Sequence, residues 1–264
     1  SNLKTRADDG TKDTVTLTYS GNTAVHSGNN YTATVTALSG EDAGNYTLTG
    51  ATNPSLVWGI AKKAVSVESW NYLNTGMSPT SGIYEHGTTV LTYNGRAFTV
   101  TANLSGVMGG DNVSLVYSEN VKTNAGTYRA TVNLAPSVID YVMEETTGEW
   151  TVDKLTVNVS WSAATFDYDG TETSVFATAI NQAAEDTVTF DYVGELKSDY
   201  GLIEGNAATH AGVYTVTVSK VNDTNYVLPA VAPSVTFTIT PRPLSLAFNS
   251  VNATYDGNGH GIDL

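Results

Sequence analysis

The sequence contains no cysteine among its 264 residues. Disulfide bonds, a cysteine nucleophile and the cysteine-containing zinc sites are therefore excluded. Histidine is scarce as well, and the four histidines lie far apart in the chain, at positions 26, 86, 210 and 260. We therefore predict no metal site.

Long apolar runs are also missing. None approaches the roughly 20 residues that a membrane-spanning helix needs, so we predict no membrane insertion. No charged and apolar leader opens the chain, and an exported protein would then be longer than this chain.

Basic residues are few: 12 Lys and Arg stand against 26 Asp and Glu, a net charge of −14. Because phosphate recognition needs clustered cations, we expect no nucleic-acid partner and no anionic membrane partner. Apolar residues make up 41% of the chain and charged residues 14%, which is typical of a folded protein. At this length we expect two or three compact units.

Helical periodicity is nearly absent, whereas alternation of apolar and small polar residues is common. The alternating segments are rich in Val, Thr and Tyr and end at Gly, Asn, Asp or Pro, which predicts β-strands. They are residues 15–19, 31–38, 64–69, 97–104, 113–117, 128–134, 155–161, 188–192, 214–221 and 235–240. The best helical candidate is the short segment 179–186, where a non-helical structure is favoured. We predict an all-β fold.

Five short blocks recur along the chain in a fixed order. They are a Tyr-Asn/Asp-Gly turn, an Asp-x-Val-x-x-x-Tyr strand, a Gly-x-Tyr or related strand, an Asn/Asp-Tyr pair, and an aromatic strand that runs into the next unit. The turn occurs at 93–95, 168–170 and 255–257, and the Asp-x-Val strand at 13–19, 111–117 and 186–192. The Gly-x-Tyr strand occurs at 26–35, 124–132 and 210–218, and the Asn/Asp-Tyr pair at 45–46, 140–141 and 225–226. The aromatic strand occurs at 57–67, 149–159 and 237–246.

These blocks divide the chain into four repeat segments. The first repeat, 1–61, is the C-terminal part of a domain; the second, 62–152, and the third, 153–240, are complete; and the fourth, 241–264, holds N-terminal strands only. Each complete repeat has the size of a small β-sandwich domain, Ig-like or β-grasp-like. We therefore predict tandem domains that form an elongated array.

The Tyr-Asp-Gly block has three possible readings: a turn, a calcium loop and a pair of catalytic carboxylates. Asn-Gly and Asp-Gly between strands favour a type I′ hairpin turn, because these residues tolerate positive φ. A calcium loop needs several oxygen ligands, yet Asp167 is replaced by Thr92 and Thr254 in the other copies. A turn is the favoured interpretation.

The ordered blocks resemble the MBG and YDG-type tandem repeats of large bacterial surface proteins. The resemblance covers nearly the whole chain. It implies an extracellular, non-catalytic β-domain array in a secreted or cell-surface adhesin, with no catalytic residue and no cofactor. Adjacent acidic residues such as Glu144 and Glu145 do not suggest an enzyme either, because glycosidase carboxylates face each other across about 5–10 Å and neighbours on a strand point to opposite faces.

Two insertions interrupt the repeats, at 71–88 in the second and 193–206 in the third. Loops on a rigid scaffold often carry binding groups, and Trp70, Tyr72 and Tyr84 are aromatic side chains that can stack on sugar rings. A glycan- or mucin-binding module with its site on 71–88 is therefore the alternative to a stalk or spacer. For Trp70 a core position is favoured, because Trp161 occupies the matching place.

The fourth repeat carries the strands that the first repeat lacks. Placed before residues 1–60, residues 241–264 restore the order of the blocks. One hypothesis is head-to-tail self-association, in which identical chains complete each other and form open-ended assemblies. The favoured alternative is a fragment of a longer array, cut within two equivalent loops.

Overall fold

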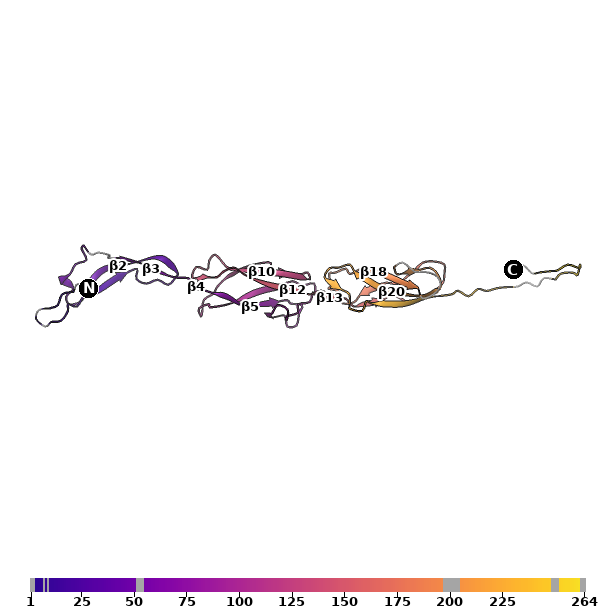
Figure 1. The fold of residues 1–264 in the computed structure, drawn as a ribbon, viewed down its shortest axis with the longest axis horizontal. Coiled ribbons are helices and arrows are strands. Elements are labelled where there is room, and N and C mark those ends of the chain that lie inside the picture. The colour runs from indigo at the N-terminus through magenta and orange to yellow at the C-terminus, as the bar shows by residue number, and fades with distance from the viewer. Residues whose placement is uncertain are drawn as a thin grey trace. The chain divides into compact units, whose positions relative to one another are not determined.

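The computed structural model of the chain describes residues 3–6, 8, 10–50, 55–196, 205–247 and 252–261. Within them the regular structure is almost entirely β-strand (Figure 1), and the one helical element is a 3-10 turn, η1 (Ala43–Asn45). The strands are β1 (Thr16–Ser20), β2 (Gly28–Ser39), β3 (Ser55–Ile60), β4 (Lys63–Ala64), β5 (Ser66–Leu73), β6 (Ser81–Tyr84), β7 (Phe98–Ser105), β8 (Leu115–Ser118), β9 (Val121–Lys122), β10 (Gly126–Leu134), β11 (Tyr141–Val142), β12 (Thr146–Val152), β13 (Leu155–Thr156), β14 (Val159–Trp161), β15 (Thr165–Asp167), β16 (Thr173–Ser174), β17 (Ala177–Ala179), β18 (Phe190–Leu196), β19 (Ala207–Ala208), β20 (Gly212–Val221), β21 (Tyr226–Val227) and β22 (Ser234–Thr240).

The all-β prediction is confirmed. Each of the ten segments with alternating residues contains a strand. Segment 179–186 is not helical: β17 ends at Ala179, and turns and bends follow. Within the described part of the chain, no helix is long and apolar enough to cross a membrane.

The chain divides into two compact units. Unit 1 comprises residues 1–91 and 96–152, and unit 2 comprises residues 153–264 with the short segment 92–95. The division after Val152 coincides with the boundary predicted between the second and third repeats. The other predicted boundaries are not resolved by this division and stay predictions.

Among its described residues, unit 1 contains three antiparallel sheets and one short parallel pair. Their strand orders are β1-β2-β3, β6-β5-β7-β9, β12-β10-β8 and β11-β4. The two central sheets are joined by side chains: the backbone N–H of Thr151 in β12 donates to Tyr84 Oη in β6 at 3.0 Å, and that of Ala102 in β7 donates to Tyr117 Oη in β8 at 3.0 Å. Fully buried side chains lie on both, among them Phe98, Val100, Val132 and Trp150.

Unit 2 contains a four-stranded sheet, β15-β22-β20-β18, and three two-stranded pairs, β14-β17, β16-β19 and β13-β21. Strand β15 runs parallel to β22, whereas β18 and β22 flank β20 in antiparallel fashion. The period-two pattern places alternate residues of β20 and β22 in the core. The core cluster is Val175, Ala208, Tyr214, Val216, Phe237 and Ile239.

The Tyr-Asp-Gly block forms a turn, but not the predicted type I′ hairpin. Gly170 has φ of 84°, while Glu119 is the one non-glycine with positive φ in the described part of the chain, so Asp169 lacks the φ that type I′ needs. Strands β15 and β16 pair with β22 and β19 and not with each other. Asp169 Oδ1 instead accepts hydrogen bonds from the N–H and hydroxyl of Thr171 at 2.8 and 2.7 Å. These bonds lower the pKa of Asp169.

The core of unit 2 leads to a stability prediction with an internal control. Phe237 has no exposed surface and stacks on Tyr214 with ring centroids 5.1 Å apart. We expect F237A to lower the free energy of unfolding by about 3–5 kcal/mol, since it removes packed atoms and leaves a cavity. Phe176 is 55% exposed, and F176A should change stability by less than about 1 kcal/mol. Urea unfolding of both variants measures the difference; equal losses would contradict this account of the core.

Candidate functional site

The structure does not bring the predicted sugar-stacking residues together on a surface. Tyr72 and Tyr84 are each only 7% exposed, and they lie on the paired strands β5 and β6. Their rings are part of the core, so they do not form the stacking surface that the glycan-binding alternative assigns to them. The physical reason is that the insertion 71–88 extends the central sheet as a hairpin, and its alternate residues point inward.

Trp70 is partly buried against the opposite sheet. A Cβ on Gly148 of β12 would lie 2.4 Å from the indole ring, so the ring packs directly on that glycine. This position agrees with the core interpretation favoured for Trp70. Trp161 also packs against the core of its own unit.

Sequence reasoning missed Asn74, which anchors the insertion. Its side chain is 1% exposed and its Nδ2 donates to the carbonyl oxygens of Arg96 and Ala97, both at 3.2 Å. Its Oδ1 accepts from the backbone N–H of Gly76 at 2.8 Å. The Asn-x-Gly spacing is a turn signal that pointed to this side chain. The insertion at 193–206 lies partly outside the described residues.

One polar contact recurs in the first three repeats. In each, the tyrosine of the Asn/Asp-Tyr block donates its hydroxyl to the aspartate of the Asp-x-Val block, and we call this contact the Asp–Tyr pair. The three pairs are Asp13–Tyr46 (2.7 Å), Asp111–Tyr141 and Asp186–Tyr226 (2.6 Å). The same tyrosine oxygens accept a backbone N–H, from Lys4 at 2.8 Å, Met108 at 3.0 Å and Ala183 at 2.8 Å.

The Asp–Tyr pair connects strands that are distant in sequence. Tyr141 begins β11 and Tyr226 begins β21, and both are buried, at 6% and 2% exposure. These strands pair in parallel with β4 and β13, the first strands of their repeats. The pair therefore fastens the start of the repeat to its middle. The hydrogen bond to Asp111 raises the pKa of Tyr141.

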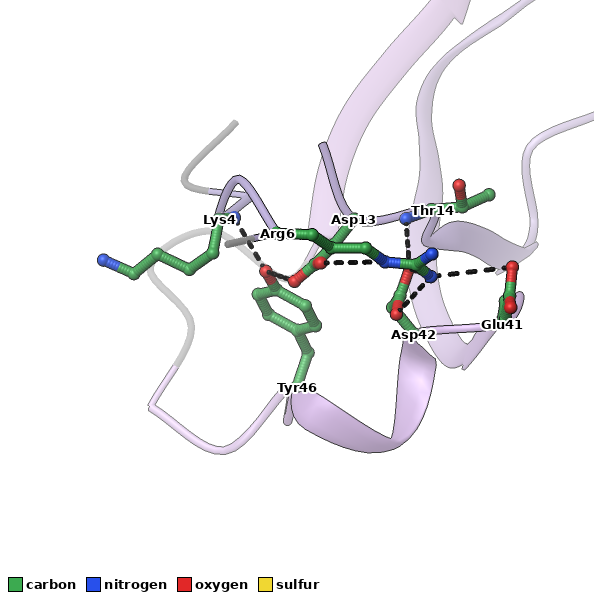
Figure 2. A network of polar contacts seen from close by, with 7 residues as sticks. All are labelled: Lys4, Arg6, Asp13, Thr14, Glu41, Asp42 and Tyr46. Atoms are coloured by element: carbon green, nitrogen blue, oxygen red, sulfur yellow. Dashed lines mark hydrogen bonds and ion pairs between the residues drawn. The ribbon is translucent and has the colours of Figure 1, made fainter. Parts of the chain in front are cut away.

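In the first repeat an arginine, Arg6, lies beside the aspartate of the Asp–Tyr pair (Figure 2). Arg6 Nη2 lies 2.7 Å from both carboxylate oxygens of Asp42, and its Nε lies 3.7 Å from Asp13 Oδ1. Glu41 is 3.5 Å from the same guanidinium but its side chain is 78% exposed, against 10% for Asp42. Asp42 also accepts the backbone N–H of Thr14 at 2.7 Å.

In unit 2 the addition is a second tyrosine. Tyr93 Oη lies 2.8 Å from Asp186 Oδ2, the oxygen that also accepts from Tyr226, and the two rings are edge to face at 5.6 Å. Burial raises the pKa of both tyrosines, and hydrogen bonding to Asp186 raises it further. For Tyr226 the pKa reaches about 12.

A second tyrosine contact recurs in the third block. The hydroxyls of Tyr31, Tyr128 and Tyr214 donate to the carbonyl oxygens of His26, Asn124 and His210 at 2.7–2.8 Å. Each ring contacts the aromatic residue of the fifth block at 5.0–5.1 Å, in the pairs Tyr31–Trp58, Tyr128–Trp150 and Tyr214–Phe237. The recurring tyrosines therefore serve the same structural contacts in each repeat.

The first repeat also contacts the second within unit 1. His26 Nδ1 lies 2.7 Å from Asp140 Oδ2, the N–H of Ser27 donates to Asp140 Oδ1, and the Ser27 hydroxyl donates to the carbonyl of Ile139 at 2.7 Å. The pKa of Asp140 is lowered, mainly by the hydrogen bond with His26 and next by the hydrogen bond from the Ser27 N–H. His26, Ser27 and Asp140 border a cavity of about 360 Å³, which is lined also by Met108 and Tyr141, among others.

Within the described ranges, no three His, Asp or Glu side chains gather in a way that could hold a metal ion. The aspartates of the three Asp–Tyr pairs and Asp42 instead accept hydrogen bonds from tyrosine, arginine or backbone groups.

No protein-family model matches this sequence, and no curated protein matches it.

The Arg6 network leads to a prediction on stability. D42A removes the bidentate partner of Arg6 and the acceptor of the Thr14 N–H, and we expect it to lower the free energy of unfolding of the N-terminal part by about 1–3 kcal/mol. E41A removes an exposed carboxylate and should cost less than about 1 kcal/mol. Limited proteolysis and urea unfolding compare the two. Equal resistance of both variants would show that the network does not stabilise the fold.

The Tyr93–Tyr226 contact leads to a pH prediction. The ordinary pKa of tyrosine is 10.0, and in the folded state that of Tyr226 is about 12. A raised folded pKa contributes stability that is complete below pH 10 and is lost as the pH rises toward 12. We expect stability to fall across this window, and Y93F/Y226F to remove that part of the fall.

The control for this titration is Y19F/Y255F, which removes two tyrosines that are 47% and 90% exposed. Ultraviolet absorbance of tyrosinate should lose its most alkaline ionisations in Y93F/Y226F and keep them in the control. The same loss in both variants would contradict the assignment.

Proposed function

We propose that this chain is a non-catalytic repeat region of a secreted or cell-surface bacterial adhesin, in which tandem β-sandwich domains act as a stalk or spacer. The observation that supports it most is the recurrence of the Asp–Tyr pair in three repeats. A contact used three times, at matching aspartate and tyrosine positions, serves the construction of the repeat and not the chemistry of one site.

The internal packing supports the sandwich part of the proposal. The sheets β6-β5-β7-β9 and β12-β10-β8 bury residues of both between them and are linked by the Tyr84 and Tyr117 hydroxyls. In unit 2, Trp161 of β14 and Tyr192 of β18 contact each other across two sheets, with ring centroids 6.1 Å apart. Two layers of strands around one core are the usual arrangement of a small β-sandwich.

The short joints between repeats support the spacer part. Strand β3 ends at Ile60 and β4 begins at Lys63; β12 ends at Val152 and β13 begins at Leu155. Two residues between strands leave little slack in a linker, and a linker this short restrains the domains that it joins. The net charge of −14 opposes collapse of the repeats onto one another.

Small-angle X-ray scattering tests the spacer proposal. A compact protein of this length would have a radius of gyration of roughly 18 Å, and a stalk would have a clearly larger value that changes little between low and high salt. A value near that of the compact protein would contradict the proposal. A large value that varies strongly with salt would indicate a loosely tethered chain and would contradict it as well.

The second candidate function is glycan or mucin binding on the 71–88 insertion. The observation that favours it is apolar exposure: Leu73 and Ile83 on the hairpin are 50% and 59% exposed, next to the edge formed by β6. Exposed apolar surface at a strand edge is a common feature of binding sites.

A glycan and mucin binding screen tests this candidate. The variant L73S/I83S changes the exposed face and leaves the buried Tyr72 and Tyr84 in place, and V116S changes a 46% exposed residue elsewhere in unit 1. Binding lost in the first variant and kept in the second supports a recognition site on the hairpin. Absence of saturable binding by the unmodified protein contradicts it and leaves the spacer.

A further inference from the structure

Two residues of the first repeat bind a carboxylate of the second repeat within unit 1. Asp140 Oδ2 lies 2.7 Å from His26 Nδ1, and Asp140 Oδ1 accepts the N–H of Ser27. The Ser27 hydroxyl donates to the carbonyl oxygen of Ile139 at 2.7 Å. These contacts join residues 26–27 to residues 139–140, and we call them the latch.

The latch lies beside the covalent joint between the first and second repeats. Strand β3 ends at Ile60 and β4 begins at Lys63. Gly28, next to Ser27, pairs with Ile60, and the N–H of Lys63 donates to the carbonyl oxygen of Asp140 at 2.9 Å. The two repeats are thus connected twice, once through the chain and once through the latch. A short linker alone keeps the freedom of its backbone dihedrals, whereas a second connection beside it removes that freedom.

The titratable groups around the latch differ in the pH range in which their residue types change charge. Lys63, Asp111 and Tyr141 line the same cavity as the latch, and the Tyr31 hydroxyl donates to the carbonyl oxygen of His26 at 2.8 Å. Lysine, aspartate and tyrosine ordinarily titrate outside the range of about pH 5–8, whereas imidazole changes its charge inside it. His26 is therefore the residue through which pH in this range acts on the latch.

The next two repeats carry amides at the corresponding positions. Asn124 corresponds to His26, because the carbonyl oxygen of each accepts from the tyrosine hydroxyl of its own third block. Asn225 corresponds to Asp140, because each directly precedes the tyrosine of the Asn/Asp-Tyr block. The asparagine amide has no ionised form. The chain itself therefore supplies a non-ionising replacement for each member of the latch.

We propose that the latch makes the joint between the first and second repeats pH-sensitive: His26 and Asp140 restrain it most firmly in mildly acidic solution and release it in part as the pH rises through the neutral range. Protonation of the imidazole turns the contact into a hydrogen bond between two charged groups, which is stronger than its neutral counterpart. The two side chains are 64% and 34% exposed, so the ratio of released to latched molecules changes by only about two- to fivefold. The inference concerns one joint and does not depend on the spacer role.

Strong acid releases the latch by a second route. The pKa of Asp140 is lowered from its ordinary value of 3.8, mainly by the hydrogen bond with His26 and next by that from the Ser27 N–H. A lowered folded-state pKa contributes stability that is present above the ordinary value and is lost as the pH falls through the folded-state value. The latch is therefore firmest at roughly pH 4–6, between the two titrations.

Pulsed electron paramagnetic resonance between two spin labels tests the latch in the whole chain. Because the chain has no cysteine, V57C and V116C place one label on each of the two repeats, at residues that are 62% and 46% exposed. The distance distribution should be narrowest near pH 5, and the share of released molecules should rise about two- to fivefold at pH 8. In H26N/D140N on the same labelled background, the distribution should be the same at both pH values.

The matched control is H86N on the same labelled background. The side chain of His86 is 57% exposed and its Nε2 lies 4.0 Å from Glu149 Oε2, but both residues belong to the second repeat. H86N should therefore keep the pH dependence. A distribution that is the same at pH 5 and pH 8 without H26N/D140N, or an equal pH dependence with it, would overturn the proposal.

The amide signal of Ser27 in NMR spectra gives the second readout, because its N–H donates to the Asp140 carboxylate. In the unmodified chain this signal should shift as Asp140 titrates below pH 3.8, and D140N should abolish the shift. H26N removes the main cause of the lowered pKa, so the midpoint should move up toward 3.8. A Ser27 signal that follows no carboxylate titration, or an unchanged midpoint in H26N, would contradict the latch.

Discussion

The hydrogen bond from a tyrosine hydroxyl to an aspartate is the interaction on which the rest of the structure depends. It recurs as Asp13–Tyr46, Asp111–Tyr141 and Asp186–Tyr226. A part-buried hydroxyl and a part-buried carboxylate are costly to leave unpaired, so the arrangement that satisfies both is favoured. In the second and third repeats, that arrangement brings together the Asp-x-Val block, the strand that begins with the tyrosine (β11 or β21) and its parallel partner (β4 or β13).

The repeats keep this pair and change what is added to it. Arg6 reaches the pair in the first repeat together with Asp42, and Tyr93 reaches it in unit 2. Asp186 thereby accepts a second hydrogen bond, from Tyr93, whereas Asp13 gains an ion pair with Arg6 at 3.7 Å. Contacts of this kind extend the polar network around the pair. The Asp–Tyr pair is thus a constant structural contact around which two of the three repeats add a polar side chain of their own.

Much of the fold could be predicted from the sequence, whereas the site could not. Alternation identified the strands, since it reports which residues face a core. The aspartate and tyrosine blocks were recognised as repeats, but their contact was not, because 30–40 residues separate the partners and no local pattern reports a pairing over that distance. Tyr72 and Tyr84 were assigned to a binding loop because an insertion reads as a loop; the structure makes it a hairpin with a buried face. The prediction of a type I′ turn was wrong because Asp169 has a negative φ. Its carboxylate accepts the N–H of Thr171 in a local turn instead.

The central claim is that the Asp–Tyr pair fastens the repeat, and a double-mutant cycle on Asp186 and Tyr226 tests it most directly. D186A, Y226F and the double variant are compared with the unmodified protein by urea unfolding of unit 2. If the claim holds, the two changes are coupled by about 1–3 kcal/mol, as expected for residues in one buried hydrogen-bond network. Additive effects, with a coupling near zero, would contradict it and would make the tyrosine an ordinary core residue.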